Sequence, residues 1–271
     1  AHDADCKVCA QLHQSDSNLL AMFKYIPGLL LKKITPDQLR EKLNAEVAPY
    51  ITNMSQRKIH EIISGFGKAA ALAKQAGFDM VQVHGDRMCG SFSSAIFNHR
   101  TDEYGGSVEN RQRFLLETID AVAEAVGNSH VAVRLSPFGR IYDLAPYEGE
   151  EQTWSAITDA LGQRELAYVH LYYQPVYTKA PLPEGFRRRF RNTFKGTIIA
   201  AGGFTRDIAE QALEDDELDL VAFGVPYIAN PDLVERMQNG WPLAESDRAT
   251  YYGVSGSPEK GYTDYPVWQA Q

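Results

Sequence analysis

Short apolar runs alternate with amphipathic segments along most of the chain. The runs are rich in Val, Ile and Leu, which is typical of strands buried in a parallel sheet. We expect strands at residues 6–12, 78–83, 131–136, 166–172, 197–201 and 218–223. Between them, apolar residues recur every three or four positions and predict helices, most clearly over residues 55–77 and 107–126.

This alternation of strands and helices predicts an α/β fold built on a parallel sheet. A chain of 271 residues, 44% of them hydrophobic, can bury a large core, and we expect residues 1–271 to form a single domain. Residues 15–53 interrupt the pattern and predict a helical or irregular insertion. Thr35 followed by Pro36 marks a helix start within it.

Composition narrows the classes of partner and compartment. A net charge of −8 argues against a nucleic-acid partner or an anionic membrane surface. No apolar run approaches the ~20 residues that span a bilayer, and the first residues lack the pattern of a secretion signal. Three cysteines cannot form a disulfide framework, so we expect a cytoplasmic protein. Cys6 and Cys9 form a C-x-x-C, but without a second pair we favour structural cysteines over a redox or zinc site.

His84 is the first candidate for catalysis. It ends the apolar run in GFDMVQVHGDR, residues 77–87, and a long connection follows it. In an α/β barrel, functional residues lie at the carboxyl ends of strands. A histidine that is simply hydrogen-bonded at a strand end is the plainer alternative.

Two further patterns indicate chemistry. Arg134 lies inside the apolar strand VAVRL, where a guanidinium requires either a structural ion pair or an anionic ligand. Gly202 and Gly203 lie between a strand and a helix that begins after Thr205, which would let backbone amides approach a phosphate. His170, within another predicted strand, is expected in the core. The arginines among residues 187–191 are expected to form a solvated face.

The segment NHRTDEYGGSVENRQRF, residues 98–114, resembles the signature of the Old Yellow Enzyme family, the FMN-dependent ene reductases. The resemblance extends over residues 6–266 and implies a TIM (β/α)8-type barrel. The family's first two barrel strands have no counterpart among the predicted strands, which would leave two open edges. We therefore expect a homo- or hetero-oligomer, or residues 15–53, to cover those edges.

The resemblance also implies cofactors and roles. FMN would be the cofactor, NAD(P)H the reductant, and the substrate a small unsaturated carbonyl compound with an activated alkene, held at its carbonyl by His84. The residues that would contact FMN are Gln11 and Arg134 at the ring and Gly202, Gly203 and Gly224 at the phosphate.

Three positions depart from the family pattern. After His84, the expected paired donor and tyrosine proton donor are replaced by Arg87 and Cys89, so either the Cys89 thiol or water would supply the proton. Val225 stands where the family has a phosphate-binding arginine, which predicts weaker FMN binding. Two alternatives therefore stay open. One is a non-redox isomerase, dehydratase or cyclase that uses His84, Arg87 and Asp86 for acid–base chemistry. The other is a non-catalytic partner of a full-length homologue.

Overall fold

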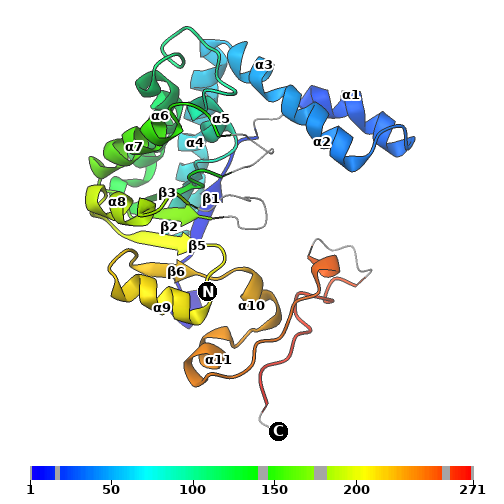
Figure 1. Cartoon of the computed structure of the whole chain (residues 1–271), viewed down its shortest axis with the longest axis vertical. Coiled ribbons are helices and arrows are strands. Elements are labelled where there is room, and N and C mark those ends of the chain that lie inside the picture. Colours follow the sequence, from blue (N-terminus) through cyan, green and yellow to red (C-terminus); the bar gives the residue numbers. More distant parts are fainter. Residues whose placement is uncertain (1, 16–18, 140–145, 174–181, 252–256, 270–271) are drawn as a thin grey trace.

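A parallel sheet of six strands, in the sequential order β1-β2-β3-β4-β5-β6, forms the centre of the molecule (Figure 1). The structure, a computed structural model, describes residues 2–15, 19–139, 146–173, 182–251 and 257–269. The strands are β1 Cys9–Leu12, β2 Met80–His84, β3 Val131–Leu135, β4 Tyr168–Tyr172, β5 Ile198–Ala201 and β6 Leu220–Ala222. The predicted α/β class is confirmed. Five strands lie within their predicted ranges, and β2 extends one residue beyond its range to include His84.

Helices connect the strands and begin where the sequence offers a capping side chain. Ser55, Ser107 and Thr205 each accept a hydrogen bond from a backbone amide three residues on. The α-helices are α1 Leu19–Leu30, α2 Pro36–Ala45, α3 Val47–Thr52, α4 Gln56–Gln75, α5 Met88–Ser93, α6 Val108–Val126, α7 Glu150–Gly162, α8 Phe186–Thr193, α9 Arg206–Glu214, α10 Val225–Ala229 and α11 Leu233–Asn239. Short 3₁₀ turns cover His2–Ala4, Asn128–His130 and Arg248–Thr250.

The two faces of the sheet differ in chemistry because side chains alternate along each strand. Val81 and Val83 of β2 and Val133 of β3 are fully or almost fully buried on the face covered by α4 and α6. The opposite face carries polar side chains, among them Gln82 and Arg134. The face covered by α4 and α6 is therefore apolar, and the opposite face is polar.

The sheet curves around this polar face. Tyr168 of β4 donates its hydroxyl hydrogen to Cys9 Sγ of β1 at 3.2 Å, across two intervening strands. In a flat sheet these strands would lie about 14 Å apart, beyond the reach of the two side chains. The contact therefore requires the concave arc of a barrel wall.

The insertion predicted at residues 15–53 is helical where the structure describes it. α1 and α2 pack on each other, and α3 contacts α5. Figure 1 shows α1 and α2 as an arm that projects from the body of the molecule, away from the outer strands β1 and β6. The arm therefore does not cover either edge of the sheet. None of the helices among the described residues is long and apolar enough to cross a membrane.

The connection after β2 contains a helix that the sequence did not predict. Met88 and Phe92 lie four residues apart in α5, and both are buried. Gly90 and the serines of this segment are weak helix formers, so local propensity gave no signal. Packing of Met88 and Phe92 in the core stabilises the helix instead.

The family-like signature is an architectural element. Asn98 Nδ2 donates to the carbonyl oxygens of Phe92 and Tyr104, both at 2.6 Å, which fixes the loop to the end of α5. Arg100 is 8% exposed, and its Nη1 donates to the carbonyl oxygens of Ile51, Thr52 and Met54 at 2.8, 3.2 and 2.6 Å. Its guanidinium also pairs with Asp102 at 2.5 Å. Arg100 thus caps the end of α3 and anchors the insertion to the barrel wall.

We expect Arg100→Met to lower the free energy of unfolding by about 3 kcal/mol, because it leaves buried carbonyl oxygens and Asp102 without their donor. Urea denaturation followed by circular dichroism measures this change. Arg100→Lys keeps the charge but loses the several N–H donors of the guanidinium. Its free energy of unfolding should lie between those of the wild type and Arg100→Met. A loss below about 0.5 kcal/mol, the size of ordinary surface substitutions, would contradict the capping role.

Candidate functional site

The carboxyl ends of the strands bring the predicted ring-binding residues onto one concave face. His84 of β2 is paired with Arg134 of β3, and Arg134 is paired with His170 of β4. One step below this row, Gln11 of β1 is paired with Gln82 of β2. Because partners in a parallel register point to the same face, these five side chains form one surface.

His84 lies between donors on both sides. Arg134 Nη1 is 3.2 Å from His84 Nε2, and the backbone nitrogen of Asp86 is 3.3 Å from Nδ1. Burial, with a smaller effect from the positive charge of Arg134, lowers the pKa of His84 to about 4. The ring is therefore neutral at physiological pH.

Arg134 is held by an aromatic ring as well as by His84. Its guanidinium carbon lies 4.1 Å from the ring centroid of Tyr172, a cation–π contact. Among the described residues no ion pair is seen for Arg134. This favours the ligand-contact interpretation over the structural ion pair that the sequence left open.

Asp86 lies near His84, but both of its carboxylate oxygens bind Ser136, which follows β3 directly. Its Oδ1 accepts from the Ser136 backbone nitrogen at 2.9 Å and its Oδ2 from the Ser136 hydroxyl at 2.6 Å. Asp86 Oδ2 lies 3.8 Å from His84 Nδ1, too far for a hydrogen bond. Burial raises the pKa of this carboxyl, although the hydrogen bonds from Ser136 oppose the shift. Its position is that of a structural clamp, which gives no support to Asp86 as a general base.

Arg87 and Cys89 have opposite exposures. Arg87 is exposed and adopts φ 51° and ψ −123°, an unfavourable conformation for a residue with a side chain. Cys89 is only 1% exposed and lies in the hydrophobic core. Arg87 therefore lies at the solvent-exposed end of the concave face, just beyond the carboxyl end of β2, which we call the mouth. Cys89 does not face the mouth. The expectation of a thiol proton donor rested on an extended loop, and α5 turns Cys89 inward instead.

The predicted phosphate glycines lie at the ends of β5 and β6. Gly202 and Gly203 have φ values of 104° and 72°, a conformation that favours glycine. A Cβ at Gly202 would lie 1.6 Å from the Tyr173 carbonyl oxygen, so only glycine fits there. Gly224 faces open space, and Val225 beside it is 58% exposed.

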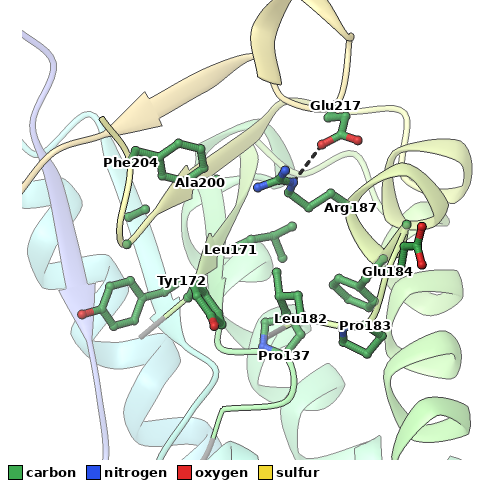
Figure 2. A pocket seen from close by; sticks show the side chains of 15 residues that line it. Pro137, Leu171, Tyr172, Leu182, Pro183, Glu184, Arg187, Ala200, Phe204 and Glu217 are labelled. Atoms are coloured by element: carbon green, nitrogen blue, oxygen red, sulfur yellow. Dashed lines mark hydrogen bonds and ion pairs between the residues drawn. The ribbon is translucent and has the colours of Figure 1, made fainter. Parts of the chain in front are cut away.

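A cavity of about 330 Å³ lies between β4, β5 and α8. Figure 2 shows the Arg187 guanidinium directed into it and paired with Glu217, at an Nε–Oε2 distance of 2.8 Å. Gly202 lines this cavity, but Gly203 and Gly224 do not. The cavity therefore does not gather the three predicted phosphate glycines. Of the arginines expected on a solvated face, Arg188 and Arg189 are exposed, whereas Arg187 is half-buried.

Sequence reasoning missed three residues of the concave face, Gln82, Tyr168 and Tyr172. It expected His170 in the core, whereas the structure places His170 on this face. His170 Nε2 is buried without a hydrogen-bond partner among the described residues, and burial lowers the pKa of His170 to about 4. The available signal was the alternation itself. Gln82 lies two positions before His84, and three polar or aromatic residues alternate with apolar ones in β4.

Comparison with known proteins shows which family the chain resembles. The sequence model of the NADH:flavin oxidoreductase / NADH oxidase family matches residues 1–244. Bilirubin reductase of Clostridium symbiosum is 38% identical over 250 residues, which cover 85% of this chain and 66% of that protein. 12-Oxophytodienoate reductase 2 of Arabidopsis thaliana is 38% identical over 217 residues, covering 79% and 57%.

Solved structures give the same result. Morphinone reductase in complex with tetrahydroNAD superposes with a TM-score of 0.72 at 43% identity, covering 80% of this chain and 58% of that one. The Old Yellow Enzyme homologue from Zymomonas mobilis gives 0.73 at 33% identity, covering 79% and 61%. The chain thus spans somewhat less than two thirds of these relatives' length, and the predicted TIM-type barrel architecture is confirmed for that part. The chain belongs to the NADH:flavin oxidoreductase / NADH oxidase family, the Old Yellow Enzyme family.

Proposed function

We propose that the protein is an FMN-dependent ene reductase that reduces the alkene of a small α,β-unsaturated carbonyl compound, with a nicotinamide as reductant. The observation that carries the proposal is a neutral His84 paired with Arg134 at the carboxyl ends of β2 and β3. The relatives named above support the class of reaction because they are reductases by name, and the morphinone reductase structure contains a nicotinamide analogue.

The described residues fit an FMN at this face. Arg134 and Gln11 provide a cation and an amide for the polar edge of a flavin ring, and the orphaned His170 Nε2 marks a buried polar atom that a ligand could satisfy. Gly202 and Gly203 adopt positive φ between β5 and α9, where their backbone amides would contact the phosphate. Bound FMN, once reduced, would supply a hydride to the substrate alkene.

His84 would orient and polarise the substrate carbonyl. A neutral imidazole has one acceptor nitrogen, while Arg134 and the Asp86 backbone both approach it as donors. Only one of those contacts can be a hydrogen bond at a time. The other ring nitrogen carries an N–H, which would donate a hydrogen bond to the substrate oxygen as negative charge develops on that oxygen.

Arg87 would support the same oxygen from the mouth of the site. Its positive charge lies close enough to contribute to the lowered pKa of His84, and strained backbone is often retained at functional positions. Because Cys89 is buried, we propose that solvent water supplies the proton that completes the reduction.

We also propose that further polypeptide pairs with β1 and β6, the outer strands of the described sheet, either within a longer chain or in an oligomer. Leu220 on β6 is 53% exposed, and open strand edges expose unpaired backbone groups. Light scattering after gel filtration would give the oligomeric state.

An absorption spectrum of the purified protein, with excess FMN and then gel filtration, tests the proposal. We expect a retained flavin band that bleaches on anaerobic addition of NADH or NADPH and returns with an unsaturated ketone. Arg134→Met should lose the band if Arg134 contacts the ring, while Arg113→Met, an outer substitution on α6, should keep it. Absence of a retained band at saturating FMN would overturn the flavin-dependent function.

We expect Val225→Arg to tighten FMN binding by about ten- to a hundredfold, because a charge-assisted hydrogen bond to the phosphate contributes ~1.5–3 kcal/mol. Val225→Gln, similar in length but neutral, is the matched control. Quenching of FMN fluorescence at low and high salt measures both affinities. Equal affinities for the two variants would show that position 225 does not face the phosphate.

Acid should destabilise the fold through His84 and His170. Their folded pKa values of about 4 lie below the ordinary value of ~6.5. Between these limits the unfolded chain binds more protons, so the free energy of unfolding falls as pH decreases from about 6.5 to about 4 and levels off below. Urea denaturation at several pH values should show a shallower fall in the double variant His84→Gln/His170→Gln. Identical pH slopes would contradict the lowered pKa values.

A further inference from the structure

A chain of hydrogen bonds crosses the floor of the concave face. Gln11 Nε2 donates to Gln82 Oε1 at 2.5 Å, and Gln82 Nε2 donates to the Tyr168 hydroxyl at 3.1 Å. The Tyr168 hydroxyl in turn donates to Cys9 Sγ at 3.2 Å. The chain begins at an exposed side chain, Gln11, and ends on partly buried ones.

Ala132 makes this chain possible. In the register of the sheet it lies between Gln82 and Tyr168, one strand from each. Its methyl group is too short to separate the two, so Gln82 reaches over β3 to the hydroxyl of Tyr168. Gln82 is 5% exposed, which makes an unsatisfied amide there costly.

The chain of hydrogen bonds has a donor-to-acceptor direction. Gln82 Oε1 accepts from Gln11, so the Gln82 amide nitrogen is left for Tyr168 and for His170 Nδ1, which lies 3.5 Å away. Reversing Gln82 would place its carbonyl oxygen against those groups and present its nitrogen to Gln11. In this arrangement Gln82 contacts one end of the Gln11 amide. It holds the nitrogen and leaves Oε1 for a ligand.

We infer that Gln82 is a positioning residue for the cofactor: by binding the Gln11 nitrogen, it makes Gln11 present a hydrogen-bond acceptor at the mouth. This inference rests on the proposed binding of FMN. The pyrimidine edge of a flavin carries an N–H between two carbonyl groups, and Gln11 Oε1 matches that N–H. If the Gln11 amide were reversed, its NH₂ group would face the flavin N–H, and two donors cannot form a hydrogen bond.

A double-mutant cycle of FMN affinity tests the inference. We expect Gln82→Leu and Gln11→Leu each to weaken FMN binding about three- to tenfold, the value of one hydrogen bond. The double variant should be no weaker than Gln11→Leu alone, because Gln82 acts through Gln11. Gln82→Glu keeps an acceptor for the Gln11 nitrogen and should bind FMN within about threefold of the wild type. Full additivity, or a Gln82→Glu affinity as weak as that of Gln82→Leu, would overturn the inference.

A second measurement is independent of the flavin. In ¹⁵N-labelled protein without FMN, we expect the Gln11 side-chain amide resonances to shift in Gln82→Leu and to remain near their wild-type positions in Gln82→Glu. If the wild type fails to bind FMN, the proposed function fails while these resonances still report on the positioning. Should Gln82→Leu not fold, Tyr168→Phe removes the acceptor behind Gln82 and should move the same resonances. Unchanged Gln11 resonances in the folded variant would overturn the positioning role.

Discussion

The site depends on the close approach of β2 and β3 at their carboxyl ends. The Gly85 backbone nitrogen donates to the Arg134 carbonyl oxygen at 2.7 Å, and Asp86 accepts both hydrogen bonds from Ser136. A Cβ at Gly85 would lie 2.7 Å from the Arg134 carbonyl oxygen and 2.6 Å from Leu135. Glycine is therefore required for the strands to close, and this closure is what places His84 opposite Arg134.

The family-like signature, residues 98–114, lies outside this β2–β3 contact and supports the connection that follows β2. Arg111 donates to the Ser93 and Gly106 carbonyl oxygens and to the Thr153 hydroxyl, which joins α5, the signature loop and α7. Together with Arg100 at the end of α3, Arg111 fixes the long connection after β2 to neighbouring helices. The residues that identify the family are thus mainly a support. The side chains of the proposed chemistry, His84 and Arg134, lie outside this signature.

The sequence alone predicted the elements that follow from hydrophobic periodicity: the six strands, the long helices α4 and α6, and the position of His84 at a strand end. The family resemblance also grouped Gln11 with Arg134, and the structure places both on the concave face. It could not predict α5, because packing of Met88 and Phe92 rather than propensity forms that helix. The burial of Cys89 follows from α5 and was missed for the same reason.

The polar chain on the concave floor was beyond prediction for a different cause. Gln82 and Tyr168 are 86 residues apart in sequence, and their contact depends on register, curvature and a small residue at position 132. Each of these is a property of the assembled sheet. The alternation of polar residues in β2 and β4 indicated which face they share, but not that they bind one another.

Local charge, rather than net charge, determines what this face can hold. The whole chain carries −8, yet Arg134 and Arg87 both act on His84 at the mouth, while the nearby carboxylate of Asp86 is turned into the β2–β3 clamp. The mouth therefore combines positive charge with a histidine that those charges and burial keep neutral. A neutral donor beside fixed cations suits a ligand that gains negative charge during reaction, because the cations stabilise that charge. A cationic histidine would already attract the substrate oxygen in the ground state. It would therefore stabilise the transition state less, relative to the ground state, than a neutral donor does.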